Sequence, residues 1–273
     1  MFWGPSAANC AMINESEVLF VDFTCYLRAV RRRPAQSSGM ERPYYADIPA
    51  IRALSADALD LSCAPVTFLV GENGSGKSTL LEAIAIAAGF NAEGGSKQQR
   101  FSTVETHAAL YKELQLTRGP FRERDGYFLR AESFYNVASD LAARNDDGCA
   151  FLSYGGRPLH AQSHGESFLA LIQNRLSGNG LYLFDEPEAA LSPNRQMALL
   201  VRIHALVQAR SQLLIATHSP ILLSYPHAVI YLLDDAGVHR TRYRDTEHYA
   251  VTRAFLNSPE RMLSILLGED GGD

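Results

Sequence analysis

One segment of the sequence, residues 71–79, combines glycines with a lysine and three hydroxyl side chains at a spacing that suits phosphate binding. It matches the pattern G-x-x-x-x-G-K-[ST] at every fixed position. In such a loop the glycines let the backbone curl around phosphates, the lysine contacts the β- and γ-phosphates, and the next hydroxyl ligates Mg²⁺. We expect Lys77 and Ser78 to take these two roles, with Thr79 near the α-phosphate. The predicted nucleotide-binding residues are Gly71, Glu72, Asn73, Gly74, Ser75, Gly76, Lys77, Ser78 and Thr79.

The sequence on either side of this loop fits a strand followed by a helix. Residues 65–70 form a short apolar, β-branched run, and residues 80–88 suit a buried helix that Gly89 would end. A strand–loop–helix unit of this kind points the N–H groups of the helix start at the phosphate oxygens. The flanks therefore support a nucleoside triphosphate site.

A pair of carboxylates follows a second apolar run, residues 180–184. Phosphate binding alone does not produce hydrolysis, because the loop supplies no general base. At the end of a neighbouring parallel strand, Asp185 can hold Mg²⁺ directly or through water, and Glu186 can orient and deprotonate the attacking water. This Walker B arrangement predicts hydrolysis of the triphosphate.

Two further segments resemble the ATP-binding-cassette (ABC) ATPases. Residues 185–192 resemble the Walker B and D-loop of that superfamily, and residues 216–220 resemble its switch-histidine segment. In the superfamily this histidine contacts the γ-phosphate and holds the catalytic geometry. The resemblance gives that role to His218, so that Lys77, Glu186 and His218 are the expected catalytic residues.

ABC ATPases also carry a signature motif at a helix start, which binds the γ-phosphate held by the other protomer of a head-to-tail dimer. Residues 162–167 match its place, followed by an apolar helix at 168–176. The resemblance implies nucleotide contacts from Ser163 and Gly165 and an ATP-dependent homodimer. The same residues fit an ordinary capped helix start, with Ser163 as N-cap and Glu166 completing a capping box.

Two other features of the superfamily have weaker counterparts. Its Mg²⁺-sensing glutamine should follow a strand, but the strand expected at residues 126–131 leads into Glu132. Gln98 and Gln99 lie in a polar, glycine-rich loop. Tyr44 and Tyr45 are placed for stacking on adenine or, equally, for packing.

From about residue 42 to residue 267 the chain is similar to a family of small stand-alone ATPases of the ABC type, grouped with the AAA family. The similarity includes residues 68–84, 128–134, 163–170 and 246–248. It implies ATP binding and hydrolysis and leaves the biological task open. We expect a cytoplasmic ATPase that uses ATP and Mg²⁺ and whose protein or nucleic-acid partner the sequence does not identify.

Two alternatives use the same motifs. One is the ATP-binding subunit of an ABC transporter, which would work with a separate membrane permease. The other is a nucleotide-gated binding switch, for instance for nucleic acid, in which binding of ATP rather than its turnover is what matters.

The elements that position these residues predict an α/β fold: a P-loop NTPase of the ABC type, with a mixed sheet, a short helical lobe and a small antiparallel part. Apolar strands are expected at 18–23, 66–70, 181–184, 213–216 and 228–233, with a hairpin at 234–237. Ser-Pro pairs at 192, 219 and 258 predict helix starts in which serine is the N-cap. We expect an N-terminal extension with the first strand at 1–40, and a single ATPase domain at 41–273 whose reduced lobe covers roughly 90–165.

Composition is consistent with this class. Hydrophobic residues make up 47% of the 273-residue chain, which is enough for a core, and the net charge of −5 argues against a surface that is basic as a whole. Basic groups at 28–33 and 118–124 are local exceptions, expected to be solvated or to contact phosphates. The four cysteines are widely spaced and there is no run of 18 apolar residues, so we expect neither a zinc site nor a transmembrane segment.

Overall fold

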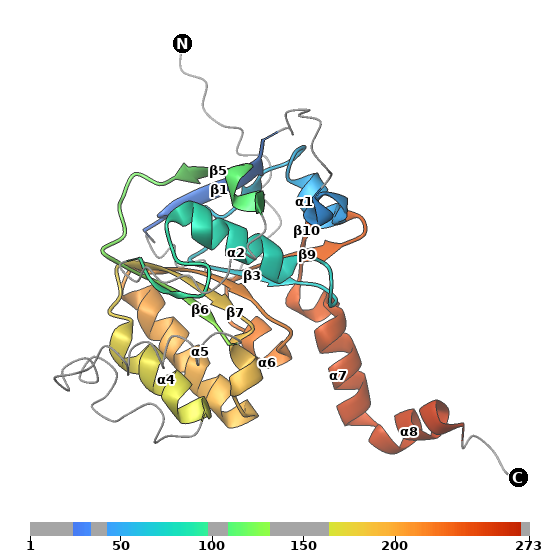
Figure 1. Ribbon diagram of the computed structural model, residues 1–273. Coiled ribbons are helices and arrows are strands. Elements are labelled where there is room, and N and C mark those ends of the chain that lie inside the picture. Colours follow the sequence, from blue (N-terminus) through green and yellow to red (C-terminus); the bar gives the residue numbers. More distant parts are fainter. Residues whose placement is uncertain (1–23, 34–42, 98–108, 132–163, 269–273) are drawn as a thin grey trace, which may run out of the picture.

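The computed structural model describes residues 24–33, 43–97, 109–131 and 164–268. Within them a seven-stranded sheet has the order β10-β9-β3-β8-β7-β6-β4 (Figure 1). Its five inner strands are parallel, and both edge strands are antiparallel. The strands are β3 (Val66–Val70), β4 (Gly95–Ser96), β6 (Asp125–Arg130), β7 (Gly180–Asp185), β8 (Gln212–Ala216), β9 (Val229–Asp234) and β10 (Gly237–Thr241).

The three central strands, β3, β8 and β7, are buried along their whole length. A parallel sheet covered on both faces needs apolar side chains on both, which explains why these strands are continuous apolar runs rather than alternating ones. Successive residues then serve different cores: Phe68 packs in one hydrophobic cluster and Leu69 in the other. Local sequence was therefore enough to predict these strands.

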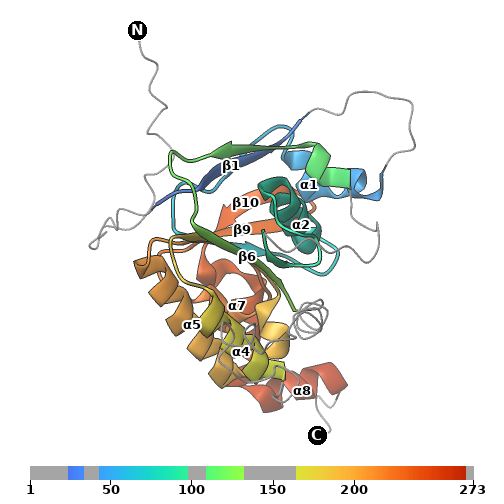
Figure 2. The same ribbon diagram turned by 60° about the vertical axis from the view of Figure 1, so that its left-hand side comes forward.

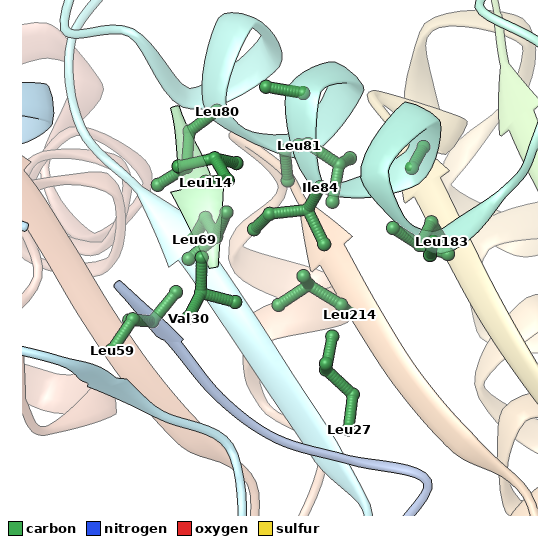
Figure 3. Packing of buried hydrophobic residues seen from close by; sticks show 14 of the residues in the cluster. Leu27, Val30, Leu59, Leu69, Leu80, Leu81, Ile84, Leu114, Leu183 and Leu214 are labelled. Atoms are coloured by element: carbon green, nitrogen blue, oxygen red, sulfur yellow. The ribbon is translucent and has the colours of Figure 1, made fainter. Parts of the chain in front are cut away.

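Helix α2 (Lys77–Ala88) covers one face of the sheet. A three-stranded antiparallel sheet, β2-β1-β5, covers α2 from the other side, so that the helix lies between two sheets (Figure 1). The small sheet consists of β1 (Leu27–Arg32), β2 (Leu59–Asp60) and β5 (Leu114–Arg118). In the core between these layers Val30 of β1, Leu81 and Ile84 of α2, and Leu214 of β8 belong to one cluster (Figure 3).

The opposite face of the central sheet is covered by α4 (His164–Arg175) and α5 (Pro193–Gln208), as Figure 2 shows. Phe168 and Ile172 of α4 pack with Leu199 and Ile203 of α5 in the second cluster. The protein is thus layered: small sheet, α2, central sheet, and the α4–α5 layer.

One buried side chain joins the small sheet to the central one. Gln212, at the start of β8, accepts hydrogen bonds from the backbone N–H groups of Tyr26 and Leu27 at 2.9 and 2.8 Å. Its amide group donates to the carbonyl oxygens of Leu27 and Leu61 at 2.8 and 3.0 Å. These bonds satisfy backbone groups at the point where both sheets meet.

The Ser-Pro pairs do begin helices: α5, α6 (Pro220–Leu223) and α8 (Pro259–Leu267). Only Ser219 caps with its side chain, which accepts from the N–H groups of Ile221 and Leu222. The predicted side-chain caps at Ser192 and Ser258 are wrong, because neither hydroxyl makes that bond. Proline at the first helical position accounts for these two starts by itself, since it fixes φ and lacks an N–H.

The C-terminal helices α7 (Glu247–Asn257) and α8 extend away from the layered body (Figure 1). Ahead of them the predicted hairpin joins β9 to β10, with Gly237 at φ +119°. The shorter elements are η2 (Tyr44–Asp47), α1 (Pro49–Ala53), η3 (Ala109–Lys112), η6 (Pro187–Ala190) and η7 (Tyr243–Asp245). Among the helices of the described segments, none has the length and apolar character needed to cross a bilayer.

The N-terminal half differs in part from what the sequence predicts. The strand expected at 18–23 lies outside the described residues, and the basic run that follows it is strand β1, where Arg32 is buried and pairs with Glu113 at 2.8 Å. Tyr45 is buried and donates to the same carboxylate, so it belongs to the core, whereas Tyr44 is exposed. Of the lobe predicted at 90–165, the described parts form β4, η3, β5 and β6.

Candidate functional site

The predicted phosphate loop connects β3 to α2. Gly71, Gly74 and Gly76 have φ values of +152°, +86° and +94°, which residues other than glycine rarely adopt. A Cβ at position 71 would lie 2.2 Å from the carbonyl oxygen of Leu233, and one at position 76 would lie 2.8 Å from Ile48 Cγ2. Glycine is thus needed both for the turn and for close packing against β9 and the residue preceding α1.

Lys77, the first residue of α2, points back across this loop. Its Nζ donates to the carbonyl oxygens of Gly71 and Glu72 at 2.9 and 2.8 Å, and the residue is only 4% exposed. Burial lowers the pKa of the ammonium group, while nearby carboxylates, Glu186 and Asp185 first among them, act in the opposite direction. A positive charge is therefore held inside the curl of the loop, where phosphate would bind.

Asp185 reaches the loop from β7, two strands away from β3 in the sheet. Its Oδ1 accepts a hydrogen bond of 2.8 Å from the hydroxyl of Ser78, the second residue of α2. Oxygen ligands of this kind are what Mg²⁺ prefers, and the ion commonly uses one or two carboxylates together with substrate phosphates. The donor set therefore fits Mg²⁺, and no cluster of three or more His, Cys, Asp or Glu ligands occurs in the described segments.

Glu186 follows directly in a left-handed backbone conformation, with φ 48° and ψ 52°. Its Oε1 lies 3.6 Å from Nε2 of His218, which follows β8, the strand between β3 and β7. Because β3, β8 and β7 are parallel, their carboxyl ends meet at one edge of the sheet. The loop, the two carboxylates and the histidine accordingly converge there. Contrary to our expectation, the strand of the carboxylates is not the neighbour of the loop's strand, because β8 lies between them.

Glu188 fixes the backbone at this edge. Its Oε1 accepts the N–H of His218 at 2.5 Å. Burial raises the pKa of the Glu188 carboxyl, although this hydrogen bond acts to lower it. The segment after β7 is in this way tied to the segment after β8.

A second histidine touches the first from the far end of the chain. Nε2 of His248, on α7, lies 2.9 Å from Nδ1 of His218. The pKa of His218 is lowered by burial and by the charges of Lys77 and His248, with Glu186 opposing. Burial and Lys77 also lower the pKa of His248, with Glu247 opposing. Both rings are thereby favoured in the neutral form.

Arg130, at the end of β6, is placed beside the carboxylates of the site. Its Nη1 lies 2.7 Å from Glu82 Oε2 on α2, and its Nε lies 3.6 Å from Asp185 Oδ2. The guanidinium thus links the helix of the phosphate loop to the end of β7. Glu132, two residues further on, lies outside the described residues.

The signature segment is described only in part. Ser163 lies outside the described residues, and α4 begins one residue later. Gly165 is buried, and a Cβ there would lie 2.7 Å from the carbonyl oxygen of Ala190 and 2.4 Å from Arg195 Nη1. Close packing therefore accounts for this glycine, and its contact with nucleotide stays a prediction.

Sequence reasoning gave no role to Arg130, Glu188 or His248, although all three contact predicted site residues. For Arg130 a signal existed, since it ends a strand parallel to β7 and lies at the same sheet edge. Glu188 is close in sequence to the Walker B pair, but its partner is 30 positions away. No spacing rule connects His248 to His218, so only the fold could reveal that contact.

The site and the parallel sheet define a P-loop nucleoside triphosphatase. Residues 155–224 match the family described as "AAA domain, putative AbiEii toxin, Type IV TA system", and residues 50–137 match a family described as "AAA domain".

Curated relatives include the macrolide export ATP-binding/permease protein MacB of Neisseria meningitidis, 26% identical over 67% of this chain and 31% of that protein. The cobalt import ATP-binding protein CbiO of Salmonella paratyphi A is 24% identical over 69% of this chain and 73% of its own length. The chain therefore spans about a third of the length of MacB. Among solved structures, cbiO1 of Clostridium perfringens, part of the ABC transporter complex cbiONQ, has a TM-score of 0.49 at 15% identity, covering 89% of this chain and 99% of that one.

The matched families and the curated relatives agree with the resemblance in the motifs. They support a P-loop ATPase of the ABC type that binds and hydrolyses ATP.

Proposed function

We propose that the chain is a Mg²⁺-dependent ATPase that closes as a head-to-tail homodimer over ATP and reopens after hydrolysis. The observation that carries this proposal is the convergence of four side chains at one sheet edge. Ser78 bonds to Asp185 at 2.8 Å, and Glu186 lies 3.6 Å from His218, all beside Lys77.

The roles follow from the chemistry of each group. Lys77 neutralises charge on the β- and γ-phosphates, and the loop N–H groups at the start of α2 orient them. Glu186 orients and deprotonates the attacking water, and His218 positions the γ-phosphate through Nε2. Ser78 and Asp185 are the side chains that would hold Mg²⁺. The chemistry that a bound Mg²⁺ supplies is neutralisation of charge on the β- and γ-phosphate oxygens.

The position of α4 supports a dimer. Its start packs against η6 at the carboxyl edge of the sheet, because Gly165 lies against Ala190. This is the edge at which Lys77 lies, but α2 and α4 cover opposite faces of the sheet (Figure 2). A second chain in head-to-tail orientation would therefore bring the start of its own α4 to the γ-phosphate bound at Lys77. Ser163 and Gly165 of the second chain would contact that phosphate.

The variant Glu186→Gln tests the assignment of the general base. It keeps the size of the side chain but removes the base, so turnover should fall at least about 100-fold while ATP stays bound. Phosphate release and nucleotide retention measure the two effects. Glu260→Gln, on the exposed surface of α8, is the matched control. Undiminished turnover in the Glu186 variant would refute the assignment.

A second candidate function, the ATP-binding subunit of a transporter, is favoured by the names of the relatives, which are import and export ATP-binding proteins. The two candidates differ in the partner. Capture of the Glu186→Gln protein from its native cells should recover a membrane permease if it is a transporter subunit. Recovery of the chain alone, or with a soluble protein or nucleic acid, would support the stand-alone, cytoplasmic ATPase.

A further inference from the structure

The contact between His218 and His248 joins the end of β8 to the start of α7. The ring centroids are 5.1 Å apart and the rings are tilted by 49°. His248 is the second residue of α7, close behind the N-cap residue Thr246, whose side chain accepts the N–H of Tyr249. The position of the His248 ring is therefore set by a capped helix rather than by a loose connection.

Only one proton can occupy the 2.9 Å gap between His218 Nδ1 and His248 Nε2. A neutral imidazole carries one N–H, so one ring donates and the other accepts. The opposite nitrogen of His218, Nε2, faces Glu186 Oε1 at 3.6 Å. A bare lone pair on Nε2 would face a carboxylate and, with ATP bound, a phosphate oxygen, which are acceptors themselves.

The electrostatic surroundings allow this neutral pair. Lys77 and burial disfavour a positive charge on either ring, and the carboxylates Glu186 and Glu247 only partly oppose them. Glu188 accepts the backbone N–H of His218, which fixes the main chain that carries the ring.

We propose that His248 is a positioning residue whose Nε2–H donates to Nδ1 of His218 and holds the switch histidine in the tautomer that presents Nε2–H to the γ-phosphate. An outer hydrogen bond that fixes an imidazole tautomer is a known way to orient a functional histidine. This role of His248 rests on the proposed contact between His218 and the γ-phosphate.

Nitrogen NMR of the full chain with ¹⁵N-labelled histidine tests the tautomer without nucleotide or turnover. The signals of His218 are assigned by their loss in His218→Gln. We expect His218 to be the Nε2–H tautomer in the unsubstituted protein and in His248→Gln, whose amide can donate. His248→Phe has an aromatic ring but no N–H to donate, so we expect His218 to be a mixture of both tautomers in this variant. An Nδ1–H tautomer in the unsubstituted protein, or a pure Nε2–H tautomer in His248→Phe, would overturn the proposal.

Turnover provides the second measurement. His248→Phe should lower kcat by about 10- to 100-fold, the range seen when the outer partner of a metal-ligating histidine is removed, with KM for ATP little changed. His248→Gln should recover most of kcat, and His204→Phe, which removes a histidine bonded to Tyr225 on another surface, should match the unsubstituted protein. Equal losses in the Phe and Gln variants would contradict a donating role. Because the tautomer is measured without turnover, a failed assignment of Glu186 or His218 in catalysis remains distinguishable from a failed role of His248.

Discussion

Glu186 has a left-handed backbone conformation that is rare for residues other than glycine. Such conformations cluster at functional sites, where the surrounding structure maintains them. Here the hydrogen bond from the Glu186 N–H to the carbonyl oxygen of Ala216 holds the backbone in place. The consequence is that the carboxylate following a buried strand turns toward His218.

This conformation predicts a difference between two substitutions. Glu186→Gly should be about 0.5–1 kcal/mol more stable than Glu186→Ala, because glycine avoids a left-handed cost of about 1–2 kcal/mol and loses part of that gain through greater freedom when unfolded. Urea unfolding of the two variants measures the difference. Equal stabilities would mean that the backbone has relaxed at this position.

The two histidines predict a pH dependence of stability. Since folding lowers the pKa of both His218 and His248, the unfolded chain binds more protons as pH falls below the usual histidine value of about 6.5. Stability should thus be fully present above this value and decrease as the pH falls toward the lowered pKa values. The groups that face the pair are Lys77, Glu186, Glu188 and Glu247.

The measurement is the free energy of unfolding of the unsubstituted protein and of His248→Gln at about pH 7.5 and about pH 5.5, on either side of the usual histidine pKa. The variant lacks one titrating ring and the repulsion between two protonated rings, so its loss of stability on acidification should be smaller. A larger loss in the variant would contradict the predicted direction of the effect.

At the scale of elements, Gln212 makes a prediction about how the layers are joined. Gln212→Leu keeps the volume of the side chain but leaves two backbone N–H groups and two carbonyl groups without the partner they have in the native protein. Each unsatisfied buried group costs about 1–3 kcal/mol, so the two N–H groups alone predict a loss of about 2–6 kcal/mol.

Urea unfolding of Gln212→Leu measures this loss, with Gln208→Leu at an exposed position near the end of α5 as the control. The control should change stability by less than about 0.5 kcal/mol. If both variants were equally stable, β1 would be held by its strand pairing alone.

The elements differ in how far sequence alone could predict them. The strands β3, β7 and β8, helix α2 and the β9–β10 hairpin were predicted because their signals are local: continuous apolar runs, a glycine-rich loop and a turn sequence. Strand β1 was missed because its arginines suggested a solvated charge run, whereas Arg32 is neutralised by Glu113 from a distant segment. His248 likewise depends on a partner far along the chain, and neither periodicity nor spacing encodes that contact.

At the scale of the whole molecule, the proposed site has two separate halves. The phosphate loop, Asp185, Glu186 and His218 lie together, while the start of α4 lies at the same edge but on the other face of the sheet. In a closed twofold dimer the phosphate loop of each chain would face the start of α4 of the other chain, because the same two surfaces meet twice. The α7–α8 arm is joined to the site through His248, which is part of α7 and contacts His218.

The division of the site between chains can be tested by mixing two inactive variants. Glu186→Gln lacks the general base, and Ser163→Arg places a bulky cation in the predicted signature. In a head-to-tail heterodimer of the two, one site contains both changes and the other contains neither. Random pairing makes half of the dimers heterodimers, so an equal mixture should recover about a quarter of the turnover of the unsubstituted protein at the same total concentration. A mixture no more active than its components would mean that each site is completed within one chain. Mixing Glu186→Gln with Lys77→Ala is the control, because both changes affect the same half of the site and every heterodimer then has one defect at each site.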